Sequence, residues 1–270
     1  MTTSAPTARA WWRGGSEALS LSFRIFRRTI GAKYRKSFLG YFWMVAPALL
    51  ITGGVVLASD AGVVDPGASL LPPWLSVFLG TLLWQVFAEA VDVPYQAFEG
   101  ARSYLTRVHF SRAAVVLAQL HESLLTTAVR LLAVLVLLAA WGYWHVGLVL
   151  VPVAFAGAVL LGLGLGCFLM PVCQLFADVQ QTQKLVLAYG LFLTPAMYQP
   201  QDGWFATVVA ANPVSPLIVA AREAAAGAVL SQPTAFAVVI VAGLAATIAG
   251  FVLVRAVAPI LIERMLLGGR

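Results

Sequence analysis

Long apolar runs, each close to the length of a membrane-crossing helix, dominate this chain of 270 residues. The hydrocarbon core of a bilayer is about 30 Å thick, and a helix of roughly 20 residues crosses it. The runs that meet this length are residues 38–58, 74–98, 113–140, 146–172 and 236–254. A further run, 185–197, is shorter and is interrupted by Pro195 and followed by Pro200. We therefore expect six crossings, of which the fifth is short or broken.

The composition agrees with a membrane protein built only from helices. Hydrophobic residues make up 61% of the chain and charged residues 10%, whereas soluble domains contain about 25% charged residues. Most of the surface must therefore face something other than water. The sequence predicts an all-α integral membrane protein, with a cytoplasmic tail and interface helix over residues 1–37 and a six-span domain over 38–270.

The basic residues predict the orientation in the membrane, because Lys and Arg accumulate on the cytoplasmic side. All 17 of them except Arg130 and Arg222 precede the first span, lie between spans two and three, or follow span four or span six. We therefore expect both termini in the cytoplasm. The net charge of +6 is explained by this topology, so it does not indicate a nucleic-acid partner.

The segment before the first span has the pattern of an amphipathic helix. The residues that recur on its apolar face are Leu19, Phe23, Phe26, Ile30 and Tyr34. The cations of the opposite face are Arg24, Arg28 and Arg35. Such a helix lies in the membrane interface with its cations at the headgroups. It acts either as a simple positive anchor or also as a docking surface for a cytoplasmic partner.

A second docking candidate is the cytoplasmic loop over residues 100–112. It is short and mixes cations with apolar side chains, among them Arg102, Tyr104, Leu105 and Arg107. A short helix with Tyr104 and Leu105 on one side would fit a groove on a partner protein. The alternative is an ordinary basic turn without a partner.

Two predicted spans carry polar stripes. In span two the stripe consists of Gln85, Glu89, Asp92, Gln96 and Glu99, and in span three of Arg112, Gln119, Ser123, Thr126 and Arg130. We expect Glu89 to lie close to His121 or Glu122. The stripes either hold helices together through hydrogen bonds or border a hydrated translocation path. The histidines and cysteines show no metal-ligand spacing, so we expect no metal site.

Span four contains a different packing signal. Gly162 and Gly166 form a G-x-x-x-G pattern, which lets another helix approach closely.

The segment between spans five and six is apolar but rich in Pro and Gly. We expect two short outer helices, near residues 203–211 and 215–230, that dip into the membrane and return within a gate region over 200–232. Irregular backbone at this depth is tolerated where it is buried in protein or lines a hydrated cavity. Asn212 and Pro213 suit the turn between the helices. Arg222 is the basic residue on this side, and we expect it to face the exit of a pathway.

Two sequence motifs are similar to those of a known transporter family. The stretch at 34–43, YRKSFLGYFW, is followed by Pro47, and the downstream motif contains Asn212-Pro213, Pro216 and Arg222. The chain resembles the permease subunit of ABC-2-type polysaccharide exporters, in which a Tyr-Arg-x-Ser-x-Leu-Gly-x-x-Trp pattern begins the first span. The distance between the two motifs implies a resemblance over nearly the whole chain.

The resemblance implies a role and partners. It implies export of an undecaprenyl-linked or similar lipid-linked glycan, such as O-antigen, capsule or teichoic acid, across the bacterial inner membrane. The chain has no G-x-x-x-x-G-K-[ST] motif, so ATP and Mg²⁺ are expected on a separate ATPase subunit, in two copies on a permease homodimer. The interface helix and the 100–112 loop would contact that ATPase. No cofactor is expected on this chain itself.

Aromatic side chains are the candidates for a sugar path, because sugar C–H faces stack on aromatic rings. The residues that we assign to a path or gate on this basis are Trp84, Phe87, Phe192 and Tyr198. Glu89, Asn212, Pro213 and Arg222 are assigned to the same path or gate.

Other functions remain open from the sequence alone. The same architecture would suit an ABC-2 exporter of a small lipid or drug. An ion-coupled secondary transporter is a different class, although such folds often show paired broken helices in two repeats and here only the second half has a clear break. A scaffold protein is the third alternative.

Overall fold

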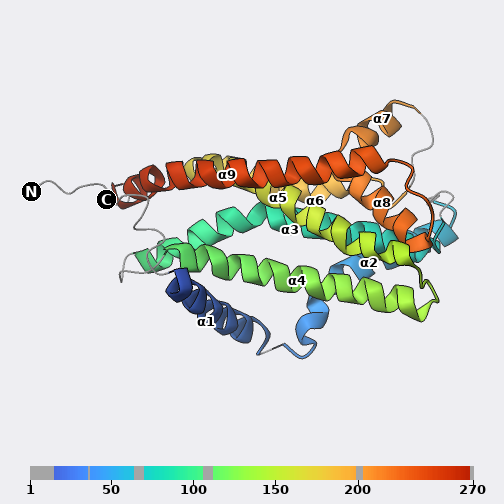
Figure 1. The fold of residues 1–270 in the computed structure, drawn as a ribbon, viewed down its shortest axis with the longest axis horizontal. Coiled ribbons are helices and arrows are strands. Elements are labelled where there is room, and N and C mark those ends of the chain that lie inside the picture. The colour runs from blue at the N-terminus through green and yellow to red at the C-terminus, as the bar shows by residue number, and fades with distance from the viewer. Residues whose placement is uncertain (1–14, 36, 64–69, 106–111, 199–202, 268–270) are drawn as a thin grey trace, which may run out of the picture.

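The computed structural model describes residues 15–35, 37–63, 70–105, 112–198 and 203–267, and every regular element in these ranges is a helix (Figure 1). In chain order the elements are α1 (Gly15–Tyr34), η2 (Gly40–Met44), α2 (Ala46–Asp60), α3 (Pro73–Leu105), α4 (Arg112–Ala140), η3 (Val146–Val149), α5 (Leu150–Leu175), α6 (Ala177–Tyr189), η4 (Gly190–Leu193), α7 (Trp204–Ala211), α8 (Ser215–Ala226) and α9 (Pro233–Leu267).

Helix α3 is the centre of the bundle. It packs against α2, α4, α5 and α8, and Figure 1 shows it running through the middle of the long helices. Its first half supplies much of the core, with Leu75, Phe78 and Leu82 almost fully buried. Of its apolar stretch, 78% is buried, compared with 11% of that of α9. A side chain on α3 is therefore far more often inside the protein than at a lipid-facing surface.

Among the described residues, four helices are long and apolar enough to cross a membrane. They are Pro73–Gly100, Leu117–Ala140, Val146–Leu175 and Pro233–Val257. They correspond to the predicted second, third, fourth and last spans. On α9, Val238, Val241 and Leu244 remain exposed in the isolated chain. A helix that exposes apolar side chains in this way is suited to a lipid environment.

The predicted first and fifth spans are shorter than a full crossing. The first run divides into η2 and the 15-residue α2, with Pro47 in the first turn of α2. The predicted fifth span corresponds to α6 and the 3-10 helix η4. Helix α6 starts at Ala177, earlier than expected, and includes polar residues. Six full crossings are therefore not confirmed by helix length and composition.

Two short helices lie close to the residues predicted for the outer pair, and their re-entrant path stays a prediction. Helices α7 and α8 meet at an angle of 87° and together form either one broken span or a re-entrant loop. Figure 1 places them at one end of the bundle, and α1, the end of α9, the end of α3 and the start of α4 at the other. The two groups of predicted functional segments therefore lie at opposite ends.

The glycines of α5 allow the close approach that the G-x-x-x-G pattern predicts. A Cβ atom on Gly162 would lie 2.5 Å from the carbonyl oxygen of Phe87 in α3, and one on Gly166 would overlap the carbonyl of Val91. Any side chain at these two positions would push α5 and α3 apart.

Candidate functional site

Helix α1 packs against α4. Ile30 is buried, and the rings of Phe23 and Phe26 lie 6.4 Å and 5.8 Å from the ring of His121 in α4. Nζ of Lys33 forms an ion pair with Oε1 of Glu122 at 2.8 Å. The predicted segment is therefore a helix, and part of its apolar face contacts α4, whereas its position in a membrane interface stays a prediction.

The predicted cations of α1 are available at the surface. Arg24 and Arg28 are exposed, as is Arg35 just after the helix. Nε of Arg24 donates to the carbonyl of Ser20 within the same helix. The side chain of Tyr34 lies outside the described part of the structure. The exposed guanidinium groups suit an acidic partner surface or lipid phosphates, and their role in ATPase coupling stays a prediction.

The predicted coupling loop is partly helical. Helix α3 continues through Arg102, Tyr104 and Leu105, beyond the expected end of the span at residue 98, and α4 begins at Arg112. The side chains of these three residues lie outside the described set, as does the whole of residues 106–111 with Arg107. The connection between α3 and α4 is thus shorter than the predicted loop.

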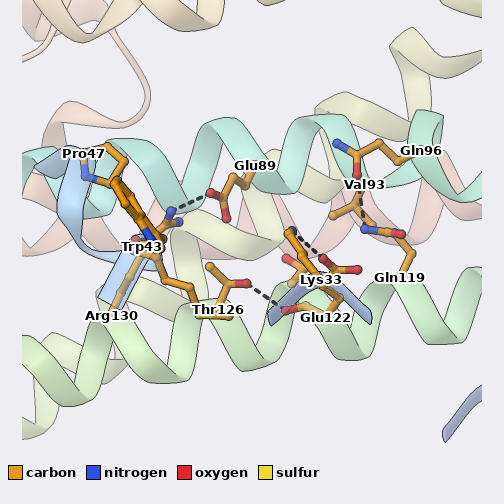
Figure 2. A pocket seen from close by; sticks show the side chains of 12 residues that line it. Lys33, Trp43, Pro47, Glu89, Val93, Gln96, Gln119, Glu122, Thr126 and Arg130 are labelled. Atoms are coloured by element: carbon orange, nitrogen blue, oxygen red, sulfur yellow. Dashed lines mark hydrogen bonds and ion pairs between the residues drawn. The ribbon is translucent and has the colours of Figure 1, made fainter. Parts of the chain in front are cut away.

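The polar stripes of α3 and α4 face each other across a cavity of about 330 Å³ (Figure 2). Lys33 of α1 and Trp43 of η2 also line it. In Figure 2, Glu89, Val93 and Gln96 extend from α3, and Gln119, Glu122, Thr126 and Arg130 extend from α4. Both alternatives for the stripes therefore have support, since the side chains bond across the helices and also surround a polar space.

Glu89 contacts a different residue from those expected. Its Oε1 accepts a hydrogen bond from Nη2 of Arg130 at 2.5 Å, whereas Glu122 pairs with Lys33. Glu89 and Glu122 line the same cavity, but the ring of His121 contacts Phe23 and Phe26. The prediction was therefore right that Glu89 and Glu122 lie in the same region. It included neither ion pair, because neither Lys33 nor Arg130 was recognised as a partner.

Trp84 and Phe87 do not line a surface of this chain. Their exposed fractions are 6% and 5%, and Nε1 of Trp84 donates to the carbonyl of Leu187 at 3.0 Å. The ring of Trp84 also lies against Gly190, where an added Cβ would come within 2.6 Å of it. Both rings are buried because α2, α4, α5 and α8 cover α3, and their expected role in a path stays a prediction.

An aromatic cluster does occur at the outer end. Phe192 is half-exposed, and the hydroxyl of Tyr198 donates to the Phe192 carbonyl. The Tyr198 ring stacks on Phe205 with centroids 5.8 Å apart, and Trp204, which is 78% exposed, packs edge-on against Phe205. Trp204 and Phe205 were missed. Their signal was two adjacent aromatic residues opening an outer helix directly after Gly203.

Asn212 forms the predicted turn between α7 and α8. Its Oδ1 accepts from the backbone N–H of Val214 at 3.0 Å, and its Nδ2 donates to the Leu193 carbonyl at 3.1 Å. The side chain therefore both shapes the turn and attaches it to η4. Pro213 follows within the turn and is exposed.

Arg222 is buried, with 6% of its surface exposed. Its guanidinium donates to the carbonyl of Ser76 at 3.0 and 3.1 Å and to that of Ala196 at 2.6 Å. The side chain turns inward to these backbone carbonyls, and its expected position at a pathway exit stays a prediction. Arg222 holds α8 to α3 and to the segment before α7.

In the part of the chain that the structure describes, no group of three His, Cys, Asp or Glu side chains is arranged to hold a metal ion. What distinguishes the molecule is its arrangement along the bundle. Helix α1 lies toward one end, a cavity with charged side chains lies between α3 and α4, and a bent helical pair with an aromatic cluster lies at the other end.

No known family model matches this chain. It is 29% identical to the O-antigen export system permease protein RfbA of Myxococcus xanthus over 182 residues, which span 66% of this chain and 68% of that protein. This similarity confirms the resemblance to permeases of ABC-2-type polysaccharide exporters that the sequence motifs indicate.

Proposed function

We propose that this chain is the membrane-spanning permease subunit of an ATP-driven exporter of lipid-linked polysaccharide, such as O-antigen or a similar cell-surface glycan. The observation that carries the proposal is the similarity to an O-antigen export permease over two-thirds of the chain. The all-helical bundle with four spans of full length and a bent outer pair supports it.

The proposed ATPase-coupling surface is the end of the bundle that contains α1, the end of α3 and the start of α4 (Figure 1). Arg24, Arg28 and Arg35 are exposed there. ATP and Mg²⁺ would bind to the partner ATPase. A displacement of α1 by that partner would reach α4 through the Lys33–Glu122 ion pair and the contacts of Phe23 and Phe26 with His121.

The proposed path lies between two copies of the permease, each with its own ATPase subunit. Support comes from α6, which exposes Thr182, Lys184 and Leu185 together. Polar and charged side chains are costly against lipid tails, so a second copy or a hydrated path suits this surface better than lipid does. In this arrangement α6 and the short α2 would line the interface between the copies.

The proposed outer gate consists of α7, α8 and the aromatic cluster around Tyr198. Stacked and exposed rings offer faces on which the C–H surfaces of sugars pack. Asn212 ties the α7–α8 turn to η4, so the gate would move together with the end of the α6–η4 segment. The protein would lie in the bacterial inner membrane with both termini in the cytoplasm.

Co-purification tests the proposed partnership. The tagged permease is purified from its native host in mild detergent, and bound proteins are identified and counted by mass spectrometry. We expect a Walker-type ATPase in a one-to-one ratio. A Tyr104→Ala, Leu105→Ala double variant should lose it, whereas Trp204→Ala at the opposite end should retain it. A permease that remains dimeric but carries no ATPase would contradict the proposal and favour an ion-coupled transporter.

A further inference from the structure

Charged side chains line the cavity between α1, η2, α3 and α4. Lys33, Glu89, Glu122 and Arg130 all contribute to its walls (Figure 2). Its volume of about 330 Å³ would hold roughly ten water molecules at ~30 Å³ each. Charged groups within membrane spans typically face such cavities and mark functional sites.

Arg130, which lines this cavity, has one donor without a hydrogen-bond partner. Its Nε donates to the Met44 carbonyl at 2.9 Å and its Nη2 to Glu89 at 2.5 Å. Its Nη1 is buried and has no hydrogen-bond partner, and the side chain as a whole is 4% exposed. A buried, charged donor without an acceptor is costly, so this atom marks a position where a ligand acceptor would be stabilised.

The charges around Arg130 are balanced. Arg130 pairs with Glu89 and Lys33 pairs with Glu122, so the formal charges of the four side chains cancel. Glu89 uses Oε1 for Arg130 and is 47% exposed, which leaves part of its carboxylate open to the cavity. A buried cation with an unpartnered donor, beside a partly exposed carboxylate, favours a ligand that carries both a negative and a positive group.

The rim of the cavity is apolar and aromatic. Trp43 lines the cavity and is 55% exposed, and its neighbour Phe42 is 48% exposed. Leu50, in the second turn of α2, is 74% exposed. Trp is enriched at the level of lipid headgroups, and Lys33 belongs to the interface helix. A polar cavity beside an exposed apolar surface has the two halves that an amphiphile needs.

From these observations we propose that the cavity binds the headgroup of a zwitterionic glycerophospholipid, of the phosphoethanolamine type. The phosphate accepts a hydrogen bond from Nη1 of Arg130, the ammonium group meets the open side of the Glu89 carboxylate, and the acyl chains lie along the exposed surface of η2 and α2. This lipid would be a bound component of the permease and not its cargo. The inference does not depend on the proposed export function.

Native mass spectrometry of the purified protein tests the site. The protein is stripped of lipid in detergent and then titrated with phosphatidylethanolamine, with phosphatidylglycerol of the same acyl chains, or with free phosphoethanolamine. We expect saturable retention of phosphatidylethanolamine, weaker retention of phosphatidylglycerol, and none of the free headgroup. Equal or stronger retention of phosphatidylglycerol would overturn the zwitterionic assignment.

Two variants locate the binding. Ser123 is buried and lines the cavity, so Ser123→Leu fills the space while leaving both ion pairs in place. Arg130→Gln removes the unpartnered donor and should weaken binding by about tenfold or more, the effect of one lost charged hydrogen bond. Ser59→Leu, the same substitution at the far end of α2, is the control and should bind as the parent protein does.

The outcomes separate the site from general lipid adhesion. Loss of phosphatidylethanolamine in Ser123→Leu, with an unchanged size-exclusion profile, supports the site even if Arg130→Gln fails to fold. Retention of the lipid by Ser123→Leu at the parent level would overturn it, as would a cavity that takes up water alone and retains no lipid. Neither readout uses ATPase binding or glycan export, so a failure here leaves the proposed function intact.

Discussion

The guanidinium of Arg222 in α8 donates two hydrogen bonds to the backbone carbonyl of Ser76 in α3, although 146 residues separate them in the sequence. A third bond reaches the carbonyl of Ala196. Gly80 makes this geometry possible, because a Cβ atom there would lie 2.8 Å from the Cα of Ala196 and 3.0 Å from Nη2 of Arg222. The outer helical pair is thus attached to the central helix through one buried cation.

Arg222→Gln should destabilise the protein strongly. The shorter side chain leaves carbonyls of Ser76 and Ala196 without their charged donor, and hydrogen bonds to charged groups contribute about 1.5–3 kcal/mol each. We expect a loss of about 3 kcal/mol in the free energy of unfolding, measured by denaturation in detergent. Arg28→Gln, at an exposed position of α1, should change stability by less than about 0.5 kcal/mol. Equal stability of the two variants would show that the buried contacts are not stabilising.

Gly162→Ala and Gly166→Ala should each destabilise the contact between α5 and α3. The added methyl group would collide with backbone carbonyl oxygens of α3, and overpacking of this kind costs about 1–3 kcal/mol. Thermal unfolding in detergent measures the effect. Gly53→Ala in α2 is the matched control, because no atom lies within 4 Å of its added Cβ, and it should leave the midpoint unchanged or raise it. If all three variants behave alike, the close α3–α5 approach is not a stabilising contact.

Charge exchange tests the attachment of α1 to α4. Lys33→Glu places two carboxylates together at the Glu122 position and should expose α1 to proteolysis, and Glu122→Lys should act in the same way. The double exchange should restore protection. The side chain of Lys33 is 56% exposed, so water screens the pair and we expect about 0.5 kcal/mol between single and double variants. Additive effects in the double variant would argue against a direct ion pair.

Trp204→Ala should lower the rate of polysaccharide export without unfolding the protein. The ring is 78% exposed and contacts Phe205, so its removal takes a stacking face from the proposed gate while disturbing little of the core. Trp144→Ala is the matched control, since Trp144 is also an exposed tryptophan, at 74%, but it lies in the α4–α5 connection. Export is compared by the amount of surface glycan at equal protein level. Equal export by both variants would remove Trp204 from the gate.

Features that depend on local sequence were predicted well. The four long spans follow from apolar length, the turn at Asn212 follows from the conformational preference of Asn before Pro, and the close approach at Gly162 follows from the small-residue spacing. Each is a property of a few neighbouring residues or of one continuous run.

Features that depend on which helix faces meet were predicted poorly. In a membrane protein the lipid-facing side and the core-facing side of a helix are both apolar, so the pattern of Trp84 and Phe87 did not reveal that α3 is central. The buried contacts of Arg222 and the Lys33–Glu122 pair join residues far apart in the sequence. The sequence predicted that the polar stripes face polar groups or water, because a polar stripe within a span must face one or the other. It did not predict which residues surround the cavity.

Deleting the gene in its native host and following the glycan tests the central claim most directly. Surface polysaccharide and lipid-linked glycan inside the cell are measured in the parent, the deletion strain and the complemented strain. The account predicts that the surface polysaccharide disappears, that lipid-linked glycan accumulates inside, and that the intact gene reverses both changes. Unchanged surface polysaccharide with no internal accumulation would contradict the assignment to polysaccharide export.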